Sequence, residues 1–300
     1  MADPSPIQPF DLAAVRRHRA RMMRSGGGAD FLANEAAAQL ADRLADITRS
    51  FPLVLDLGCG CGAMARALAG RGTIVAADPA LACAAAASPP RLVAEPEALP
   101  FAAGSFDLVV SNPLLHWTND LPGALLQLRH ILRPDGLLLA SLWGGETLGE
   151  LRQALIEAEL EISSGISPRV SPFADLRDLG GLLQRAGFAL PVVDADRIEV
   201  TYPDALALMR DLRAMCESNA LVEQRKSFTR RATLLRAVER YGALFGRADG
   251  RVPATFELMT LTAWAPAETQ PKPLRPGSAR SRLAEALGTV ERPAGDKARP

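Results

Sequence analysis

Short apolar runs alternate with longer segments of helical spacing through the first half of the chain. The apolar runs, each followed by polar, glycine or proline residues, cover residues 53–57, 73–77, 91–94, 105–112 and 137–142. The segments with helical spacing cover residues 31–47, 64–69 and 121–132. Strands that alternate with helices are typical of a mostly parallel sheet. We therefore predict an α/β fold, with helices on both faces of the sheet.

The second half continues this pattern and then departs from it. A helix is expected to begin near Thr147, because Thr147 is a suitable N-cap and Glu150 stands three residues later, as in a capping box. The elements expected after it are strands at 191–194 and 198–202, helices at 204–216 and 228–241, and a final antiparallel strand at 255–264. We predict that the two later helices form an insertion, at about residues 203–245, that roofs a pocket.

The run Leu53–Gly62 ends a predicted strand with Asp56 and then places glycine at alternate positions, Gly58, Gly60 and Gly62. Glycine tolerates positive φ and lets a ligand lie against the main chain. The spacing is neither the dinucleotide fingerprint nor a P-loop, which needs a lysine. The D-x-G-x-G-x-G form resembles motif I of the class I S-adenosylmethionine-dependent methyltransferases. That resemblance implies that Asp56 and the glycines bind the amino acid part of the cofactor.

The ends of the next two predicted strands carry further acidic residues. Asp78 lies eighteen positions after Gly60, close to the spacing of a carboxylate that binds ribose hydroxyls. Glu95 follows the third strand, and the family resemblance implies that it accepts a hydrogen bond from the adenine amino group, with Leu99 packing nearby. Pro96 departs from the family pattern, because proline has no N–H to donate to the ring.

The fourth predicted strand ends at Ser111 and Asn112, and His116 and Trp117 follow it. Ligands in open α/β sheets bind beyond the carboxyl ends of the strands, so this segment is expected to line the pocket. Ser111 is predicted to contact the cofactor. His116, Asn112 and Trp117 are the candidate catalytic residues, with His116 as a general base or a donor that orients the substrate. A packing histidine is the alternative for His116, and Trp117 is expected to form the wall.

Composition limits the remaining choices. The chain has 300 residues, of which 48% are hydrophobic, enough for one large core, and no apolar run has the length of a membrane span. The four cysteines and three histidines lack the spacing of zinc ligands, which predicts a reducing compartment and no metal site. The formal net charge is zero, and the basic excess lies in the two tails, so no nucleic-acid surface is expected.

The two ends of the chain differ from its middle. Residues 1–30 form a basic segment that begins with a proline-rich, disordered stretch, and residues 267–300 form a proline-rich, disordered tail in which 280–287 might fold on a partner. Leu12–Arg24 has helical character and five arginines. We expect a solvated basic helix there, and a mitochondrial presequence or a lid over the cofactor pocket are the alternatives.

Several segments outside the cofactor motifs narrow the resemblance. They include Ser167–Phe173, Asp178–Leu183, Ala186–Phe188, Glu217–Asn219 and Val252–Thr255. In order and spacing they resemble mitochondrial complex I assembly factor 5 and its bacterial relatives, and more distantly the malonyl-carrier-protein methyltransferase of biotin synthesis. The resemblance runs from about Phe31 to Trp264. It implies one domain, residues 31–266, with a Rossmann-like class I methyltransferase fold and a seven-stranded sheet whose helical insertion precedes the last strand.

The same resemblance implies S-adenosyl-L-methionine as cofactor and a protein substrate, a subunit of respiratory NADH:quinone oxidoreductase. Trp143, Arg169, Glu217 and Asn219 are the candidates on the substrate side, and Arg169 either meets substrate or pairs with Asp175 or Asp178. Methyl transfer is the expected reaction. Arginine hydroxylation, which only the resemblance suggests, and an assembly chaperone that retains the cofactor site remain the alternatives. The expected location is the cytoplasm of a bacterium or the mitochondrial matrix.

Overall fold

The computed structural model describes residues 8–25, 30–163, 165–271, 278 and 283–290. Contacts within the chain divide it at Ala267 into one unit that holds the sheet and a second unit, residues 268–300. The second unit contains one described helix, α10 (Leu283–Ala286). Most of the tail and the first seven residues lie outside the described residues, so the expectation of disorder there stays untested.

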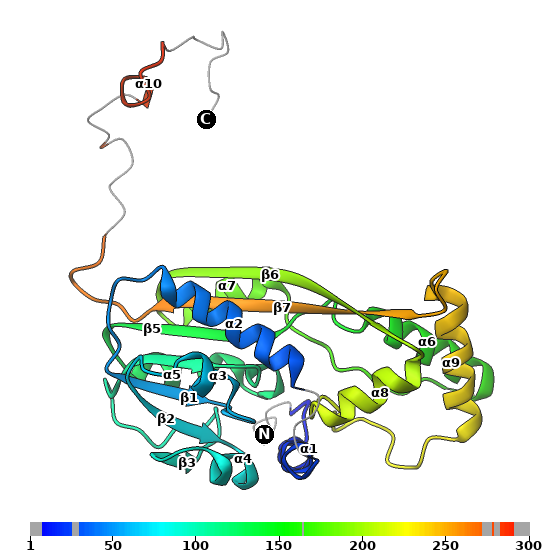
Figure 1. Cartoon of the computed structure of the whole chain (residues 1–300). Coiled ribbons are helices and arrows are strands. Elements are labelled where there is room, and N and C mark those ends of the chain that lie inside the picture. The colour runs from blue at the N-terminus through cyan, green and yellow to red at the C-terminus, as the bar shows by residue number, and fades with distance from the viewer. Residues whose placement is uncertain (1–7, 26–29, 164, 272–277, 279–282, 291–300) are drawn as a thin grey trace, which may run out of the picture. The chain divides into compact units, whose positions relative to one another are not determined.

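A seven-stranded sheet in the order β3-β2-β1-β4-β5-β7-β6 forms the centre of the first unit (Figure 1). The strands are β1 (Leu53–Leu57), β2 (Thr73–Asp78), β3 (Arg91–Val93), β4 (Phe106–Ser111), β5 (Leu132–Trp143), β6 (Ala189–Tyr202) and β7 (Val252–Trp264). The first five strands in that order are parallel, and β7 runs antiparallel to both β5 and β6. The predicted α/β fold with a seven-stranded, mostly parallel sheet is confirmed.

Helices cover both faces of the parallel part of the sheet (Figure 1). The helices of this layered region are α2 (Phe31–Ala45), α3 (Ala63–Ala67), α4 (Leu81–Ala86), α5 (Leu121–Ile131) and α7 (Leu176–Arg185). Alternate residues of β4 face opposite layers: Leu108 and Val110 pack with Leu40 of α2, and Val109 packs with Leu125 of α5. This alternation follows from the two-residue period of a strand that is buried on both faces.

The long hairpin of β6 and β7 extends beyond the parallel strands and carries a second core. It packs against α6 (Gly149–Ile162), α8 (Ala205–Ala214) and α9 (Arg231–Phe245) (Figure 1). The hydroxyl of Tyr241, a fully buried residue of α9, donates a hydrogen bond of 2.7 Å to the Pro253 carbonyl of β7. The helical insertion before the last strand is therefore present. The strands predicted at 191–194 and 198–202 are one continuous edge strand, whose polar middle was misread as a break.

The start of α6 differs from the expectation. The N-cap is Leu148, which adopts the left-handed conformation at φ 56°, and Thr147 lies before the helix. The Thr147 hydroxyl and the Glu150 carboxylate bond instead to β7, at Glu257 and Thr255 respectively. The predicted capping box is wrong because both side chains are used to fasten α6 to the sheet. Among the described residues, no helix combines the length and the apolar character needed to cross a membrane.

Candidate functional site

The glycine-rich loop lies between the end of β1 and the start of α3. Gly58, Gly60 and Gly62 have φ values of 89°, 47° and 79°, a region that L side chains seldom adopt. A Cβ on Gly58 would also lie 2.8 Å from the Cβ of Leu114. The loop is stitched to the next strand, because the Gly58 amide donates a hydrogen bond of 2.7 Å to the Ala77 carbonyl. The backbone path therefore requires the glycines that the sequence supplies.

Asp56 lies near the end of β1, just before the glycine loop. Its side chain is fully buried and lines a cavity beside the loop, and neither carboxylate oxygen has a hydrogen-bond partner among the described residues. Burial, and then the nearby Asp78 charge, raise the pKa of Asp56 to about 7, although Arg19 acts in the opposite sense. A buried carboxylate without a donor is costly, so the site is built for a cation or a donor that arrives from outside.

Asp78 ends β2 and is held on several sides. Its carboxylate accepts hydrogen bonds from the amides of Gly60, at 3.0 Å, and Ala80, at 2.9 Å. It also forms a bidentate ion pair with Arg19 of α1 (Leu12–Arg24). The Asp78 side chain is fully buried and that of Arg19 is 4% exposed. The prediction of a solvated basic helix is therefore wrong for this face of α1, because Arg19 points into the protein.

Glu95 follows β3 and pairs with Arg16, one turn before Arg19 on the same helix. Pro96 lies beside Glu95 in a small cavity under α1. Leu99 does not line that cavity, since its side chain packs against the core below the sheet edge and its amide bonds to Gln127. The structure thus brings the glycine loop, Asp56, Asp78 and Glu95 to the carboxyl ends of neighbouring strands, and the contact of Leu99 with the cofactor stays a prediction.

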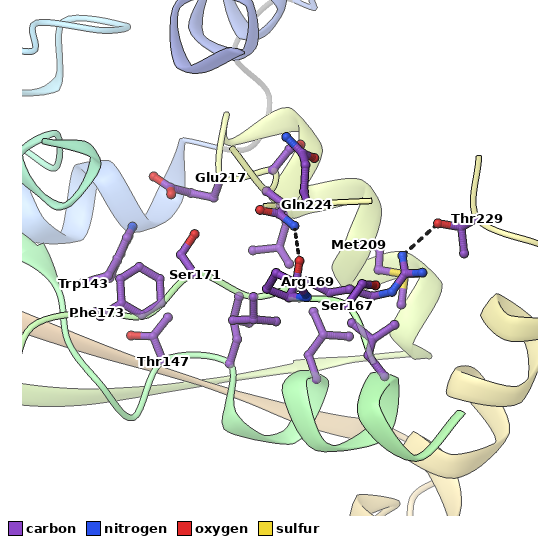
Figure 2. Close-up of a pocket in the computed structure, with 18 of the residues that line it drawn as sticks. Trp143, Thr147, Ser167, Arg169, Ser171, Phe173, Met209, Glu217, Gln224 and Thr229 are labelled. Carbon is purple, nitrogen blue, oxygen red and sulfur yellow. Dashed lines mark hydrogen bonds between the residues drawn. The ribbon is translucent and has the colours of Figure 1, made fainter. Parts of the chain in front are cut away.

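A second, larger cavity of about 270 Å³ lies between β5, α6, α8 and the segment 167–173 (Figure 2). Figure 2 shows Trp143, Phe173 and Thr147 at one end of this cavity and Arg169 reaching Thr229 at the other. Trp143 and Glu217 line both this cavity and the one beside the glycine loop. These two residues therefore form the boundary between the two cavities.

His116 and Glu217 form a buried pair at this boundary. The His116 Nε2 atom lies 3.1 Å from a Glu217 carboxylate oxygen, and the side chains are 1% and 10% exposed. The other ring nitrogen, Nδ1, is buried without a hydrogen-bond partner. His116 belongs to the one-turn helix η1 (Leu115–Trp117), and its ring centroid lies 6.4 Å from that of Trp143. The predicted candidates His116, Glu217 and Trp143 are thus brought together.

Asn112 and Ser111 lie at the end of β4, as expected. The Asn112 amide is used at both ends: it donates to the Ala33 carbonyl and accepts from the Ser141 hydroxyl, each at 2.8 Å. Asn112 lines the cavity beside the glycine loop, and its bonds tie α2 to β5 there. Ser111 is fully buried, and its hydroxyl has no hydrogen-bond partner in the structure.

Arg169 pairs with Glu159 of α6, not with Asp175 or Asp178. Its Nε atom donates a hydrogen bond of 2.7 Å to Glu159, whose carboxylate is 2% exposed and also accepts from the Ser167 amide at 2.7 Å. Burial alone would raise the pKa of Glu159, but the hydrogen bonds from Ser167 and Arg169 hold that pKa below its ordinary value. Arg169 therefore anchors the segment 167–173 that walls the larger cavity.

Asn219 and Trp117 are also wall residues of the larger cavity. The Asn219 side chain donates a hydrogen bond of 2.8 Å to the Pro168 carbonyl. Trp117 packs edge-on against Phe10, with ring centroids 5.3 Å apart. Both contacts join segments that are far apart in the sequence, so these residues shape the cavity through structural contacts of their own.

Three residues that matter at the site escaped sequence reasoning: Arg16, Arg19 and Glu159. The available signal for Arg19 was its position on α1 in line with Val15 and Met22, all three on the buried face. An arginine on such a face is normally taken as exposed to solvent. Only the partner of Arg19, which lies 59 residues away in the sequence, explains why this arginine is buried. Within the described ranges, no group of three or more His, Cys, Asp or Glu side chains has an arrangement that holds a metal ion.

The comparisons with known proteins agree with this geometry. The profile of a family described as a methyltransferase domain matches residues 30–191. The chain is 40% identical to the mitochondrial arginine-hydroxylase NDUFAF5 of Danio rerio over 92% of its own length and 88% of that protein. It is 36% identical to the malonyl-[acyl-carrier protein] O-methyltransferase of a Methylovorus strain, over 86% and 90% of the two chains.

Solved structures resemble the fold as well. The YcgJ protein from Bacillus subtilis matches with a TM-score of 0.53 and 15% identity, over 77% of this chain and 98% of that one. At this identity the likeness concerns the fold alone. The profile match, the two relatives and the glycine loop with its strand-end carboxylates all lead to the same assignment. The chain belongs to the family of methyltransferase-domain proteins that includes NDUFAF5 and the malonyl-[acyl-carrier protein] O-methyltransferases.

Proposed function

We propose that this protein binds S-adenosyl-L-methionine at the glycine loop and transfers its methyl group to a protein substrate in the larger cavity. The observation that carries the proposal is Asp56, a buried carboxylate that faces the loop cavity without a partner. The cofactor brings an ammonium group and a sulfonium, and a carboxylate of this kind gains most from a cation. When bound, S-adenosyl-L-methionine supplies an electrophilic methyl group.

The protein's own residues have separate tasks in this proposal. Asp56 holds the charged amino acid end beside the glycine loop, and Asp78 accepts hydrogen bonds from the ribose hydroxyls. Glu95 accepts from the adenine amino group. Trp143 and its aromatic neighbours keep water from the boundary between the cavities, which favours an in-line approach of the acceptor atom.

Glu217 is the residue placed to take a proton from the acceptor. It lines both cavities, so an acceptor atom that reaches the boundary comes within its range. His116 contacts the far side of the same carboxylate and fixes its orientation. An acceptor atom methylated at this boundary would release its proton to Glu217. His116 is thus a positioning residue, and Glu217 is the general base.

The nature of the substrate comes from the relatives. Proteins named arginine-hydroxylase NDUFAF5 match most of this chain, which supports a protein substrate and, by the resemblance to complex I assembly factors, a subunit of respiratory NADH:quinone oxidoreductase. The Glu217 carboxylate at the inner end of the larger cavity suits a basic side chain. We therefore place the protein in the assembly of that complex. Hydroxylation of the same side chain is the second candidate, because the relatives carry that name.

Intact-mass analysis separates these reactions. The oxidoreductase subunits are purified from a deletion strain and from the same strain with the wild-type gene or Asp56→Asn. A subunit that is lighter by one methylene without the gene supports methyl transfer, and one lighter by one oxygen atom supports hydroxylation. Unchanged subunits in every strain would contradict both and leave a chaperone role. Glu223→Gln, an exposed change near Glu217, is the control and restores the wild-type mass.

A further inference from the structure

The helix α1 pairs with two of the three carboxylates that the cofactor is expected to use, Asp78 and Glu95. Arg19 donates from Nε and Nη2 to the two oxygens of Asp78, at 3.0 and 2.5 Å, and from Nη2 to the Gly58 carbonyl at 3.2 Å. Arg16, three residues earlier on the same face, pairs with Glu95. A guanidinium that presents two N–H groups to a carboxylate offers the same donors as the two hydroxyls of a ribose. One helix therefore occupies both positions.

The space left beside these carboxylates is too small for a nucleoside. The cavity that Asp56, Arg19 and Met22 line at the glycine loop has a volume of about 50 Å³. A further pocket of about 600 Å³ against the same loop is lined by none of the three carboxylates Asp56, Asp78 and Glu95. The cavity beside Glu95, lined by Leu12, Val15 and Arg16, has a volume of about 10 Å³. Sites for cofactor-sized ligands typically enclose about 300–1,000 Å³. A nucleoside can reach Asp78 and Glu95 only when α1 or its side chains move.

Charge explains why these positions are filled by arginine. Asp56 and Asp78 are both fully buried, and each disfavours the charge of the other. Burial alone would lower the pKa of Arg19, but the Asp78 carboxylate, together with Cys216 and Cys83, raises that pKa above its ordinary value, so the guanidinium stays protonated. Arg19 supplies the positive charge that two neighbouring carboxylates need when no other donor is present. Replacing it with ribose hydroxyls and a cofactor cation near Asp56 preserves that balance.

Hydrogen bonds also join the same helix to the segment beside Glu217 that lines the larger cavity. The Asp11 amide donates a hydrogen bond of 2.8 Å to the Ala220 carbonyl, and Arg21 donates one of 3.0 Å to the Ser218 hydroxyl. Glu217 immediately precedes this segment. A movement of α1 away from the glycine loop therefore pulls on the residues that form the boundary between the two cavities.

We propose that Arg16 and Arg19 belong to the cofactor site as internal competitors, and that α1 is a plug which S-adenosyl-L-methionine must displace. The proposal rests on the proposed cofactor. In the plugged state, Arg19 stands where the ribose hydroxyls bind and Arg16 where the adenine amino group binds. Cofactor binding exchanges two ion pairs for hydrogen bonds to the ligand, and the measured affinity is reduced by the fraction of molecules that are plugged.

Calorimetric titration with S-adenosyl-L-methionine tests the competition. Arg19→Gln removes one ion pair and is expected to tighten binding at least about tenfold, because the competent fraction rises. Arg16→Gln, on a side chain that is 44% exposed, should tighten it less and serves as the variant least able to disturb folding. The matched control is Arg17→Gln, on the same helix, whose side chain is 67% exposed and pairs with Asp11. Arg17→Gln should bind like the wild type.

Hydrogen exchange gives a second measurement. Saturating cofactor should speed hydrogen exchange of the amides in residues 12–24 of the wild-type protein, because the displaced helix no longer packs against the glycine loop. Slower exchange there, or weaker binding by both Arg19→Gln and Arg16→Gln, would overturn the plug and make the arginines cofactor ligands. Equal affinity in the wild type and all three variants would also overturn it while leaving the cofactor assignment intact. No binding by any of the four proteins would overturn both.

Discussion

The two cavities that meet at Trp143 and Glu217 differ in how the chain closes them. Beside Asp56 at the glycine loop, Arg19 of α1 takes up space, and the cavity that both residues line has a volume of about 50 Å³. On the other side, about 270 Å³ stays open between α6, α8 and the segment 167–173. Beside the first cavity the carboxylate of Asp78 is paired with Arg19, and the second cavity is lined by apolar and polar side chains together. The two cavities therefore differ in whether a charged side chain of the protein must move before a ligand can bind.

The difference also separates two kinds of ion pair. Arg19 and Asp78 stand on groups that a ligand would use, so their pairing competes with binding. Arg169 lines the larger cavity and Glu159 holds it from α6, so their pairing keeps the cavity wall in place. A buried ion pair therefore has a different consequence at each cavity, and substitutions at the two pairs should have different effects.

The largest effect is expected at the boundary itself. Glu217→Gln should lower the rate of methyl transfer to the oxidoreductase subunit by about 10³-fold, because a positioned base contributes about 10²–10⁴-fold. Purified protein, the subunit and labelled cofactor provide the assay. Glu223→Gln should retain the wild-type rate. A Glu217→Gln protein with full activity would show that this carboxylate takes no proton.

A large loss of stability is expected when the ion pair beside the larger cavity is broken. Glu159→Ala leaves the Arg169 guanidinium without its buried partner and should reduce the free energy of unfolding by about 3 kcal/mol. Urea unfolding measures it. Glu157→Ala, on the same helix with a half-exposed side chain, should change that free energy by less than about 0.5 kcal/mol. Equal losses in both variants would mean that the segment 167–173 does not depend on Glu159.

A medium effect is expected from pH at the glycine loop. The pKa of Asp56 is raised to about 7, so its carboxyl is mostly neutral at pH 6 and mostly ionised at pH 8. A cation binds the ionised form, and affinity for S-adenosyl-L-methionine should therefore rise about tenfold between these values. Calorimetry at both values measures it. In Asp56→Asn the rise should vanish, and a rise of the same size in that variant would assign it to another group.

The smallest effect is expected at the far end of the β6–β7 hairpin. Arg247 and Glu199 form an ion pair there with side chains that are 41% and 42% exposed. Arg247→Ala should change the free energy of unfolding by less than about 1 kcal/mol, because solvent screens such pairs. Cofactor affinity should not change. A shift in affinity would show that the hairpin end is coupled to the site.

The sequence predicts what local rules decide. The glycines of the loop and Asp78 lie at strand ends, and a parallel sheet brings such ends to one edge. The polar middle of β6 was misread as a gap because an edge strand tolerates polar residues on its open side. The pairing of His116 with Glu217, 101 residues apart, follows from no local pattern. Helical spacing also cannot tell a solvated arginine from one that is buried against a distant carboxylate, as Arg19 is.

The contact between the start of α1 and the insertion has a consequence for the order of synthesis. Phe10 pairs as a β-bridge with Leu221, and the Val222 amide donates to the Pro9 carbonyl. These partners do not exist until the ribosome has passed residue 222. The glycine loop and Asp78 are translated long before that, so during elongation nothing on the insertion side fastens the helix that will later cover them. The segment that is translated first is thus held in place by a segment that is translated much later.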